Sequence, residues 1–337
     1  MTVQPVVTIM MPVRNEVKYI DRSLKAVLKQ DYPQSGIEII ITDGLSHDGT
    51  QEHIQSLLYE HPNISLIENP GRIVPTGLNS ALERAHGEII IRVDGHCEVA
   101  PDYVSRCVHH LLEDQVDCVG GPIETVGETY TARGIAAAMS SRFGVGNSAF
   151  RTLKDKSMLV DSVAFPAYTR QAIEITGHFD EELVRNQDDE YNYRLRKKGG
   201  KILLSPDIRS RYYSRSTLRS LWGQYFQYGF WKVRVLQKHP RQMSLRQFVP
   251  PLFVAALLTL AILSTFSIIG RALLIGLAVT YILGTLIATG SSAKKFGWRY
   301  LPILPVAFFI LHFSYGSGFI WGLAKFRRNW KSAGQDR

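Results

Sequence analysis

The chain has 337 residues, and 39 lysines and arginines outnumber 30 aspartates and glutamates to give a net charge of +9. This length suits one folded domain with an appendage. The three cysteines, Cys97, Cys107 and Cys118, form no CxxC pair, which argues against a disulfide framework and favours a reducing compartment.

Apolar runs of strand length alternate with helical patterns along the first 121 residues. The predicted strands are 6–13, 37–42, 64–68, 88–93 and 117–121, and the predicted helices are 20–28, 50–59, 75–86 and 101–113. This alternation predicts parallel β-α-β units in a doubly wound sheet, where ligands bind beyond the carboxyl ends of the strands. Asn15, Asp43 and Asp94 follow predicted strands and would lie at that edge, as a nucleotide pocket requires.

The pattern is looser after Gly121. Residues 127–156 are rich in small side chains, which predicts a mobile loop with a short helix. The remaining predicted elements, in chain order, are a strand at 162–168, a loop at 177–185, a helix at 188–198, a strand at 202–205 and a long helix at 217–237.

Three long apolar segments follow, at 248–270, 272–293 and 301–324. Each is long enough to cross a hydrocarbon core of about 30 Å at about 1.5 Å per residue, which predicts membrane helices. Buried helices of a soluble protein are the alternative, but three such lengths in a row disfavour it. In the third segment, Pro302, Pro305 and His312 leave a broken or re-entrant helix open.

Cations and aromatic residues are interleaved ahead of these segments. They suit a cytoplasmic surface against anionic lipid headgroups better than nucleic acid, because spanning helices follow directly. The residues are Arg209, Arg211, Arg215, Arg219, Lys232, Arg234, Lys238, Arg241 and Arg246, with Trp222, Tyr225, Phe226, Tyr228, Phe230 and Trp231.

The predicted strand 88–93 leads directly to two residues that can bind a metal ion, Asp94 and His96. A carboxylate at a strand end suits Mg²⁺ or Mn²⁺, and the added imidazole favours Mn²⁺. Such a site commonly binds a diphosphate. The alternative is an ordinary Asp-Gly turn.

Six motifs in order resemble the family 2 glycosyltransferases over about residues 5–240. They are Pro12-Val13-Arg14-Asn15-Glu16, Asp43-Gly44 with Asp48-Gly49-Thr50, Gly77-Leu78-Asn79, Gly87-Glu88, Asp94-Gly95-His96, and Gln187-Asp188-Asp189-Glu190 with Arg194-Leu195. The resemblance implies the α/β GT-A fold, a doubly wound mixed sheet, and inversion at the anomeric carbon. With the membrane segments, the chain is similar to bacterial glucosyltransferases of exopolysaccharide and succinoglycan synthesis.

The resemblance also implies how the donor is held. Asp43 would accept a hydrogen bond from uracil N3–H, although an Asx turn before Ser46 is an alternative role. Pro12 and Glu16 would frame the uridine, and Arg14 stands where the family often stacks a tyrosine on the base. Asp94 would bind the metal and contact the ribose, with His96 in place of the family's usual second acidic ligand.

Asp188 matches the family's catalytic base, which takes the proton from the acceptor hydroxyl as its oxygen attacks C1. The alternative is an acidic first helical turn, which favours the helix dipole. Gln187 replaces the usual glutamate beside the base and is expected to contact the acceptor. We expect the side chains of Asp94 and Asp188 to share one cleft.

Acceptor contacts would come from the long helix before the membrane segments. Gln224 and Tyr228 occupy a place similar to the Gln-x-x-Arg-Trp motif of processive synthases, but the Arg-Trp pair is missing. One sugar per acceptor is therefore expected. These two residues would either line the acceptor groove or anchor the helix at the lipid surface.

The expected domains are a GT-A catalytic domain (1–215), an amphipathic interfacial helix region (216–247), a membrane domain (248–324) and a basic tail (325–337). The function implied is transfer of a hexose, with glucose expected, from a UDP-sugar to a polyprenyl-diphosphate-linked saccharide at the inner membrane, with Mn²⁺ or Mg²⁺. The catalytic domain would be cytoplasmic, and membrane lipids rather than nucleic acid would be the other partners. A polyprenyl-phosphate sugar synthase and a non-catalytic membrane scaffold are the alternatives.

Overall fold

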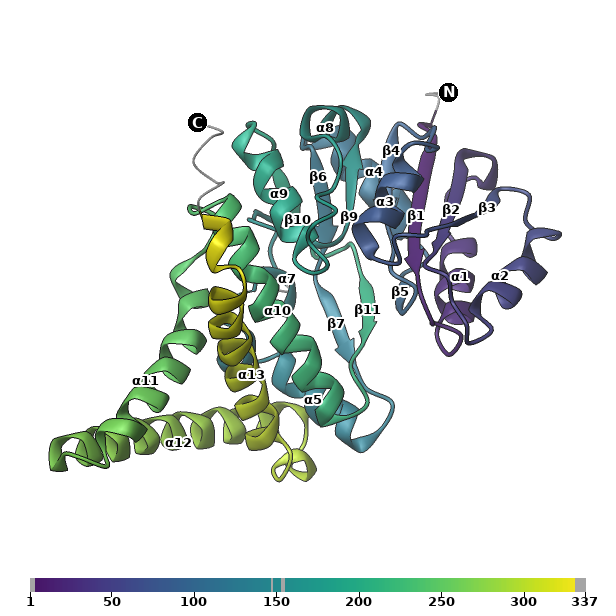
Figure 1. Cartoon of the computed structure of the whole chain (residues 1–337). Coiled ribbons are helices and arrows are strands. Elements are labelled where there is room, and N and C mark those ends of the chain that lie inside the picture. The colour runs from purple at the N-terminus through teal and green to yellow at the C-terminus, as the bar shows by residue number, and fades with distance from the viewer. Residues whose placement is uncertain (1–3, 147, 153–154, 331–337) are drawn as a thin grey trace. The chain divides into compact units, whose positions relative to one another are not determined.

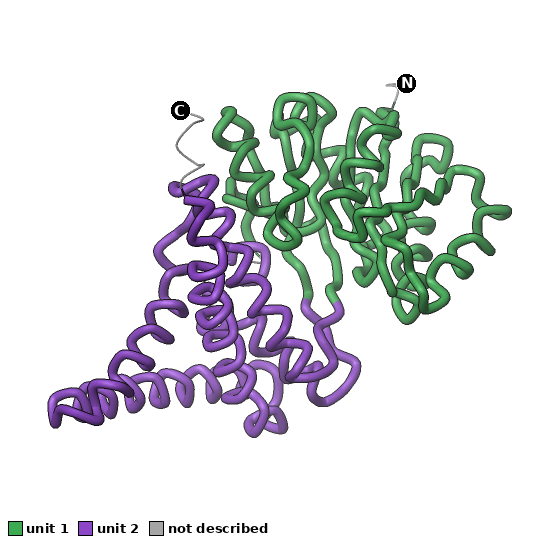
Figure 2. The backbone as a smooth tube through the Cα atoms, viewed as in Figure 1, with its two compact units in different colours: residues 1–124, 153–212 green, residues 125–152, 213–337 purple. Residues whose placement is uncertain are grey.

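The structure is a computed structural model that describes residues 4–146, 148–152 and 155–330. Two compact units divide the chain (Figure 2). We call residues 1–124 with 153–212 the sheet unit, and residues 125–152 with 213–337 the helical unit.

An eight-stranded mixed sheet forms the sheet unit, with strand order β3-β2-β1-β4-β9-β6-β10-β8 (Figure 1). Strands β1 to β4 pair in parallel, whereas β9 runs antiparallel to both of its neighbours, β4 and β6. The strands are β1 (Val7–Val13), β2 (Ile37–Asp43), β3 (Ile64–Glu68), β4 (Ile89–Arg92), β6 (Cys118–Gly121), β8 (Met158–Leu159), β9 (Ala164–Thr169) and β10 (Ile202–Leu204). The predicted α/β class with a mixed sheet is confirmed.

The helices of this unit are α1 (Ile20–Leu28), α2 (Thr50–Leu58), α3 (Val74–Leu82), α4 (Tyr103–Glu113), α8 (Arg170–Thr176) and α9 (Gln187–Lys197), with a 3-10 turn at Gln34–Gly36. Three short strands, β5 (Cys97–Val99), β11 (Ser210–Tyr213) and β7 (Ile123–Val126), form a second sheet in the order β5-β11-β7. The boundary between the two units falls within β7 and β11. The sequence analysis does not predict these strands, because each is only three or four residues long.

Central strand β1 is buried along all seven residues, as expected for a parallel strand covered on both faces. Strand β4 is equally buried, but its last residue is Arg92, only 7% exposed. A charged side chain is rarely buried this deeply unless it is paired. Strand β4 therefore places a cation at the carboxyl edge of the sheet.

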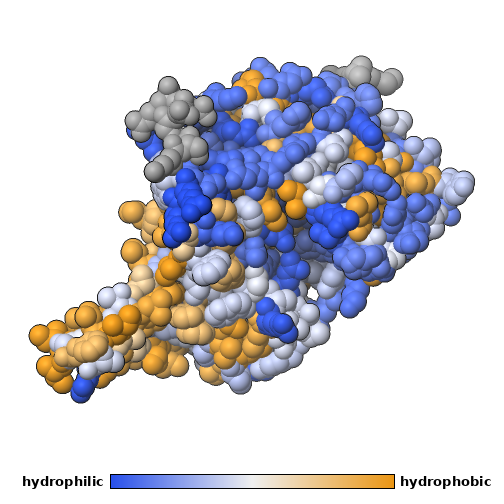
Figure 3. All heavy atoms as spheres, viewed as in Figure 1, coloured by the Kyte–Doolittle hydropathy of each residue, from blue (hydrophilic) through white to orange (hydrophobic). Residues whose placement is uncertain are grey.

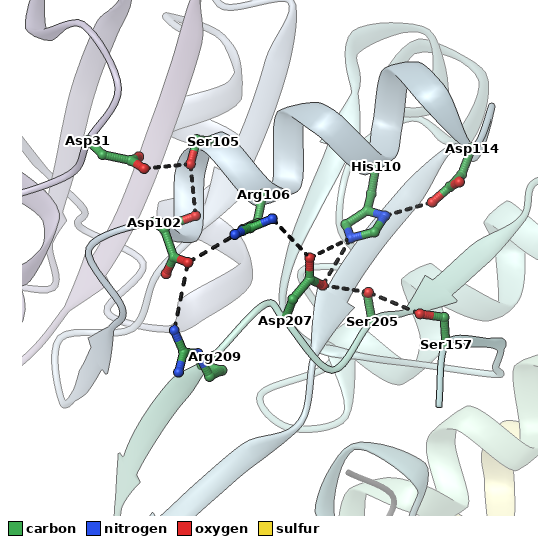
Figure 4. A network of polar contacts seen from close by, with 10 residues as sticks. All are labelled: Asp31, Asp102, Ser105, Arg106, His110, Asp114, Ser157, Ser205, Asp207 and Arg209. Carbon is green, nitrogen blue, oxygen red and sulfur yellow. Dashed lines mark hydrogen bonds and ion pairs between the residues drawn. The ribbon is translucent and has the colours of Figure 1, made fainter. Parts of the chain in front are cut away.

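A polar network joins α4 to the segment between β10 and β11 (Figure 4). His110 lies between two carboxylates, with Nδ1 2.6 Å from Asp114 and Nε2 2.9 Å from Asp207. Asp207 also accepts a hydrogen bond from Ser205 and lies 3.7 Å from Arg106. Burial alone would raise the pKa of Asp207, but the bonds from Ser205 and His110 lower it below its ordinary value.

Helices make up most of the helical unit. They are α5 (Tyr130–Met139), α6 (Arg142–Val145), α7 (Ala149–Thr152), α10 (Leu218–Lys238), α11 (Val249–Leu263), α12 (Ile268–Phe296) and α13 (Leu304–Lys325), with 3-10 turns at Leu245–Phe248, Trp298–Tyr300 and Arg327–Trp330. The prediction of a mobile loop with one short helix at 127–156 is wrong for the described part, because three helices, α5, α6 and α7, form there. Helix α5 buries seven of its ten residues, including its four alanines, through tertiary contacts that local composition does not reveal.

Three helices are long and apolar enough to cross a membrane: Leu245–Leu263, Ile268–Phe296 and Leu304–Lys325. This confirms the predicted number. The first helix ends at Leu263, earlier than predicted, and hydrophobic side chains cover the visible face of α11 and α12 (Figure 3). Helix α13 is continuous, since Pro305 lies in its first turn, where proline is tolerated.

Helices α10 and α13 approach each other through glycine. A Cβ added at Gly229 would lie 2.0 Å from the carbonyl oxygen of Tyr315, and one at Gly318 would lie 2.1 Å from that of Phe226. Small residues at such positions let two helix backbones come together. The long helix α10 is therefore packed directly on a candidate membrane span.

Candidate active site

The loops that leave β1 and β2 are tied together through Ser46. Its hydroxyl donates to Asp43 Oδ1 (2.5 Å) and accepts from the backbone N–H of Asn15 (2.8 Å). The Ser46 N–H donates to Asp43 Oδ2 at 2.9 Å. Asp43 is fully buried, and the Asx turn that the sequence left open is formed. Its role in reading uracil stays a prediction.

Two residues in these loops have positive φ without being glycine: Asn15 and Leu45, both at 55°. Asparagine adopts this region readily, but leucine does so at a cost of about 1–3 kcal/mol. The surrounding hydrogen bonds, including Gly44 N–H to Val13 O at 2.9 Å, hold the loops in this shape. Contacts within the chain therefore determine the shape of the loops at this edge.

The other residues predicted to frame the uridine lie on the β1 loop. Pro12 is buried within β1, and Arg14 is exposed, with Nη1 donating to the Arg72 carbonyl at 3.3 Å. The Glu16 carboxylate lies 2.9 Å from His96 Nδ1. Glu16 thus contacts the second proposed metal ligand, a pairing that the sequence analysis does not anticipate.

His96 is oriented from two sides. Glu16 holds Nδ1, and the Tyr212 ring of β11 packs edge-on with its centroid 5.4 Å away. Among the described residues, Nε2 has no hydrogen-bond partner. A carboxylate on one ring nitrogen and an open second nitrogen is the arrangement that usually accompanies metal-binding histidines.

The donor set at this edge fits Mn²⁺ or Mg²⁺ bound together with a diphosphate. Asp94 offers carboxylate oxygens and His96 an imidazole nitrogen, which suits Mn²⁺ better than Mg²⁺. Within residues 4–146, 148–152 and 155–330, no group of three or more metal-binding side chains is present.

Arg92 binds Asp94 in a two-point contact. Its Nε donates to Oδ1 at 2.9 Å and its Nη2 to Oδ2 at 3.2 Å. Burial would lower the pKa of Arg92, but the charges of Asp94 and Asp188 raise it above its ordinary value. Burial likewise opposes ionisation of Asp94, yet Arg92, His96 and Arg185 lower the pKa of Asp94. Asp94 is therefore a buried carboxylate paired with the Arg92 guanidinium.

Helix α9 carries Asp188 in its first turn. The N-cap residue Asn186 has φ of 64°, and Asp188 Oδ1 accepts from the Asp189 N–H at 2.9 Å. Asn79 of α3 fixes the loop before this helix, because it donates to Phe179 O (2.9 Å) and accepts from Phe179 N–H (2.8 Å). The Gly-Leu-Asn motif thus positions the segment that leads to Asp188.

The neighbours of Asp188 face different surroundings. Glu190 is buried and paired with Arg194 at 2.6 Å, so it is engaged within the helix. Gln187 is 4% exposed, and its buried Oε1 has no hydrogen-bond partner among the described residues. An unpaired buried oxygen is costly, and a water molecule could satisfy it. The role of Gln187 toward an acceptor stays a prediction.

The two predicted acceptor residues of α10 bind each other. Gln224 Nε2 donates to the Tyr228 hydroxyl at 3.0 Å, one helical turn away. Both lie in the helical unit, and their roles toward an acceptor stay predictions.

Sequence reasoning missed Arg92 and Arg185. Arg92 had a recognisable signal, because a lone cation ends the otherwise apolar run Ile89-Ile90-Ile91. Arg185 lies in a predicted loop and had none. The expectation that Asp94 and Asp188 share one cleft stays a prediction.

The chain is similar in sequence to known proteins. Residues 8–175 match the family model described as glycosyl transferase family 2. The chain is 29% identical over 326 residues to the succinoglycan biosynthesis protein ExoA of Rhizobium meliloti (strain 1021), covering 95% of this chain and 96% of that protein. It is 30% identical over 327 residues to a Methanococcus voltae enzyme, covering 95% of this chain and 97% of that protein. That enzyme is named dolichyl N-acetyl-alpha-D-glucosaminyl phosphate 3-beta-D-2,3-diacetamido-2,3-dideoxy-beta-D-glucuronosyltransferase.

A solved structure shares the fold. The mannosyltransferase PcManGT from Pyrobaculum calidifontis, solved with GDP-Man and Mn²⁺, superposes with a TM-score of 0.61 at 20% identity. The match covers 95% of this chain and 88% of that one. The mixed sheet is thus a GT-A sheet.

Proposed function

Because this chain belongs to the family 2 glycosyltransferases, we propose that it moves a hexose from UDP to a saccharide linked to a polyprenyl diphosphate. Glucose is the first donor to test. The relatives support synthesis of a polysaccharide or glycan: one is named for succinoglycan biosynthesis and another for a dolichyl-linked acceptor.

The donor would bind along the carboxyl edge of β1, β2 and β4. Asp43 would accept from uracil N3–H, Pro12 and Glu16 would border the uridine, and Arg14 would stack on the base or reach a phosphate. Asp94 and His96 would hold Mn²⁺ or Mg²⁺, which neutralises the diphosphate and makes UDP a better leaving group.

Asp188 is the proposed general base. Its carboxylate takes the proton from the acceptor hydroxyl while that oxygen forms a bond to C1 of the sugar. The bond from C1 to the UDP oxygen breaks on the opposite side and its electrons leave with UDP. A single displacement converts an α-linked donor into a β-linked product.

The observation that carries this proposal is the environment of Arg92. One buried guanidinium binds Asp94 in two places and also feels the charge of Asp188. These carboxylates come from β4 and α9, which are far apart in sequence. On this proposal, the group that stabilises the leaving UDP and the base would act on either side of this one cation.

The acceptor would approach from the membrane. We propose that the three apolar helices lie in the inner (plasma) membrane and that the sheet unit faces the cytoplasm, where nucleotide sugars are available. Gln224 and Tyr228 would then border the acceptor.

The test is transfer from radiolabelled UDP-sugars to lipid-linked acceptors in membranes that contain the full chain. We expect D94A and D188N each to reduce transfer by about 10²–10⁴-fold, with D189N as the matched control beside the base. UDP binding should need Mn²⁺ in the wild type and in D188N but not respond to Mn²⁺ in D94A. Full activity of D188N toward a polyprenyl monophosphate would contradict the proposal, because a phosphate acceptor needs no base.

A further inference from the structure

The helical unit contains a pocket of its own, with a volume of about 670 Å³. Its walls come from the α5–α6 junction, Thr152 of α7 and the second half of α12. The lining residues are Ser140, Ser141, Arg142, Phe143, Thr152, Gly284, Ile287, Ala288, Ser291 and Lys295. None of these residues belongs to the site around Arg92.

The pocket changes polarity along α12. The residues that line it from this helix, Gly284, Ile287, Ala288, Ser291 and Lys295, follow helical spacing and form one stripe. From Gly284 to Lys295 the stripe covers about 16 Å of helix axis at about 1.5 Å per residue. It is apolar at one end and carries a hydroxyl and an ammonium group at the other.

Arg142 of α6 adds a second cation to the pocket. Arg142 and Lys295 are both exposed, and neither has an ion-pair partner among the described residues. The helical unit contains nineteen lysines and arginines against two carboxylates, Glu128 and Asp336, a net of +17 in a chain whose total is +9. Cations therefore far outnumber carboxylates in the unit that contains the pocket.

A histidine braces the wall of the pocket. His312 of α13 donates from Nε2 to the Phe143 carbonyl (2.7 Å) and accepts at Nδ1 from the Tyr281 hydroxyl (3.1 Å). The Phe143 ring packs edge-on against His312, with centroids 4.9 Å apart. These contacts fix α6 against α12 and α13, so the two cations are presented from a supported scaffold.

We propose that this pocket binds a lipid phosphate, with the phosphate at Arg142 and Lys295 and the hydrocarbon chain along Gly284, Ile287 and Ala288. Arginine and lysine with neighbouring hydroxyls supply charge-assisted hydrogen bonds to phosphate oxygens. The apolar part of the stripe lies on a candidate membrane span, where an acyl or prenyl chain is stable. The inference rests on the membrane placement proposed above, and its ligand has two sources: a polyprenyl carrier or a resident anionic phospholipid.

The test measures lipid retention by the purified full chain in detergent, by native mass spectrometry, without any donor nucleotide. The probes are undecaprenyl phosphate, phosphatidylglycerol and zwitterionic phosphatidylcholine. We expect the double variant R142Q/K295Q to weaken retention of the preferred anionic lipid at least tenfold. K294Q, which removes the adjacent lysine that does not line the pocket, is the matched control and should retain the lipid.

The outcomes distinguish the two lipid sources, and they distinguish this inference from the proposed transferase function. Preference for undecaprenyl phosphate identifies a carrier-lipid site, and equal retention of both anionic lipids identifies a phospholipid site. Unchanged retention in R142Q/K295Q, or equal loss in K294Q, overturns the inference. Mn²⁺-dependent UDP binding, measured on the same variants, reports separately on the proposed transferase function.

Discussion

Replacing Arg92 by methionine removes a buried cation and leaves the carboxylates of Asp94 and Asp188 without its charge. Arg92 is 7% exposed and makes two hydrogen bonds to Asp94. Removing one partner of a buried ion pair costs about 3–5 kcal/mol, since the other charge stays buried. In a unit of this size each kcal/mol lowers Tm by about 2–4 °C, so we expect R92M to lower Tm by about 6–20 °C.

The measurement is thermal unfolding of the full chain in detergent, followed by tryptophan fluorescence, with the exposed R84M as control. The double variant R92M/D94N replaces the pair by two neutral groups and should recover at least half of the lost Tm. It should nevertheless stay inactive, because Asp94 is absent. A loss in R92M below about 2 °C, or a double variant no more stable than R92M, would refute this account of the site.

Three further predictions concern packing, pH and metal. G229A should destabilise the helical unit by about 1–3 kcal/mol or more, because its Cβ would meet the α13 backbone. The control G223A lies on the same helix, has nothing within 4 Å of an added Cβ and should not lower the Tm. Equal Tm values for the two variants would contradict the close packing of α10 on α13. The lowered pKa of Asp207 means that its stabilisation is present above the unfolded value of 3.8 and is lost as the pH falls through the folded value. D207N should therefore be less stable than wild type near pH 6, with a Tm gap that closes below about pH 4; a constant gap would exclude this effect. E16Q should weaken Mn²⁺-dependent UDP binding by about 10–100-fold through His96, and an unaltered Mn²⁺ titration would count against the pairing.

Strong periodicity made part of the fold predictable. Helix α1 spans Ile20–Leu28, as predicted, because its buried residues repeat at helical spacing, and β3 spans Ile64–Glu68 as predicted. Because whole strands are buried, their apolar runs in the sequence predicted the core of the sheet. Where an element depends on distant partners, as α5 does at Tyr130–Met139, composition suggested a loop and tertiary packing decided otherwise.

The candidate active site was likewise predictable only in part. Spacing and resemblance indicated Asp94, His96 and Asp188, because each follows a strand or opens a helix. The side chains that pair with these residues could not be predicted from the sequence. The contacts of Arg92 with Asp94 and of Glu16 with His96 depend on side-chain directions that only the folded sheet determines. The same holds for Asp43, whose turn with Ser46 could only be left as an alternative.

Helix α12 has 29 residues, which corresponds to about 44 Å of axis, whereas a hydrocarbon core is about 30 Å thick. A straight helix of this length must either tilt strongly or extend beyond the acyl chains. Its final turns contain Ser291, Ser292, Lys294 and Lys295, so the excess length falls where the helix is polar and can leave the hydrocarbon at little cost. In the proposed membrane placement, the depth of α12 in the bilayer would be set by the point where the helix changes from apolar to polar, and thicker membranes would draw the serines toward the acyl chains.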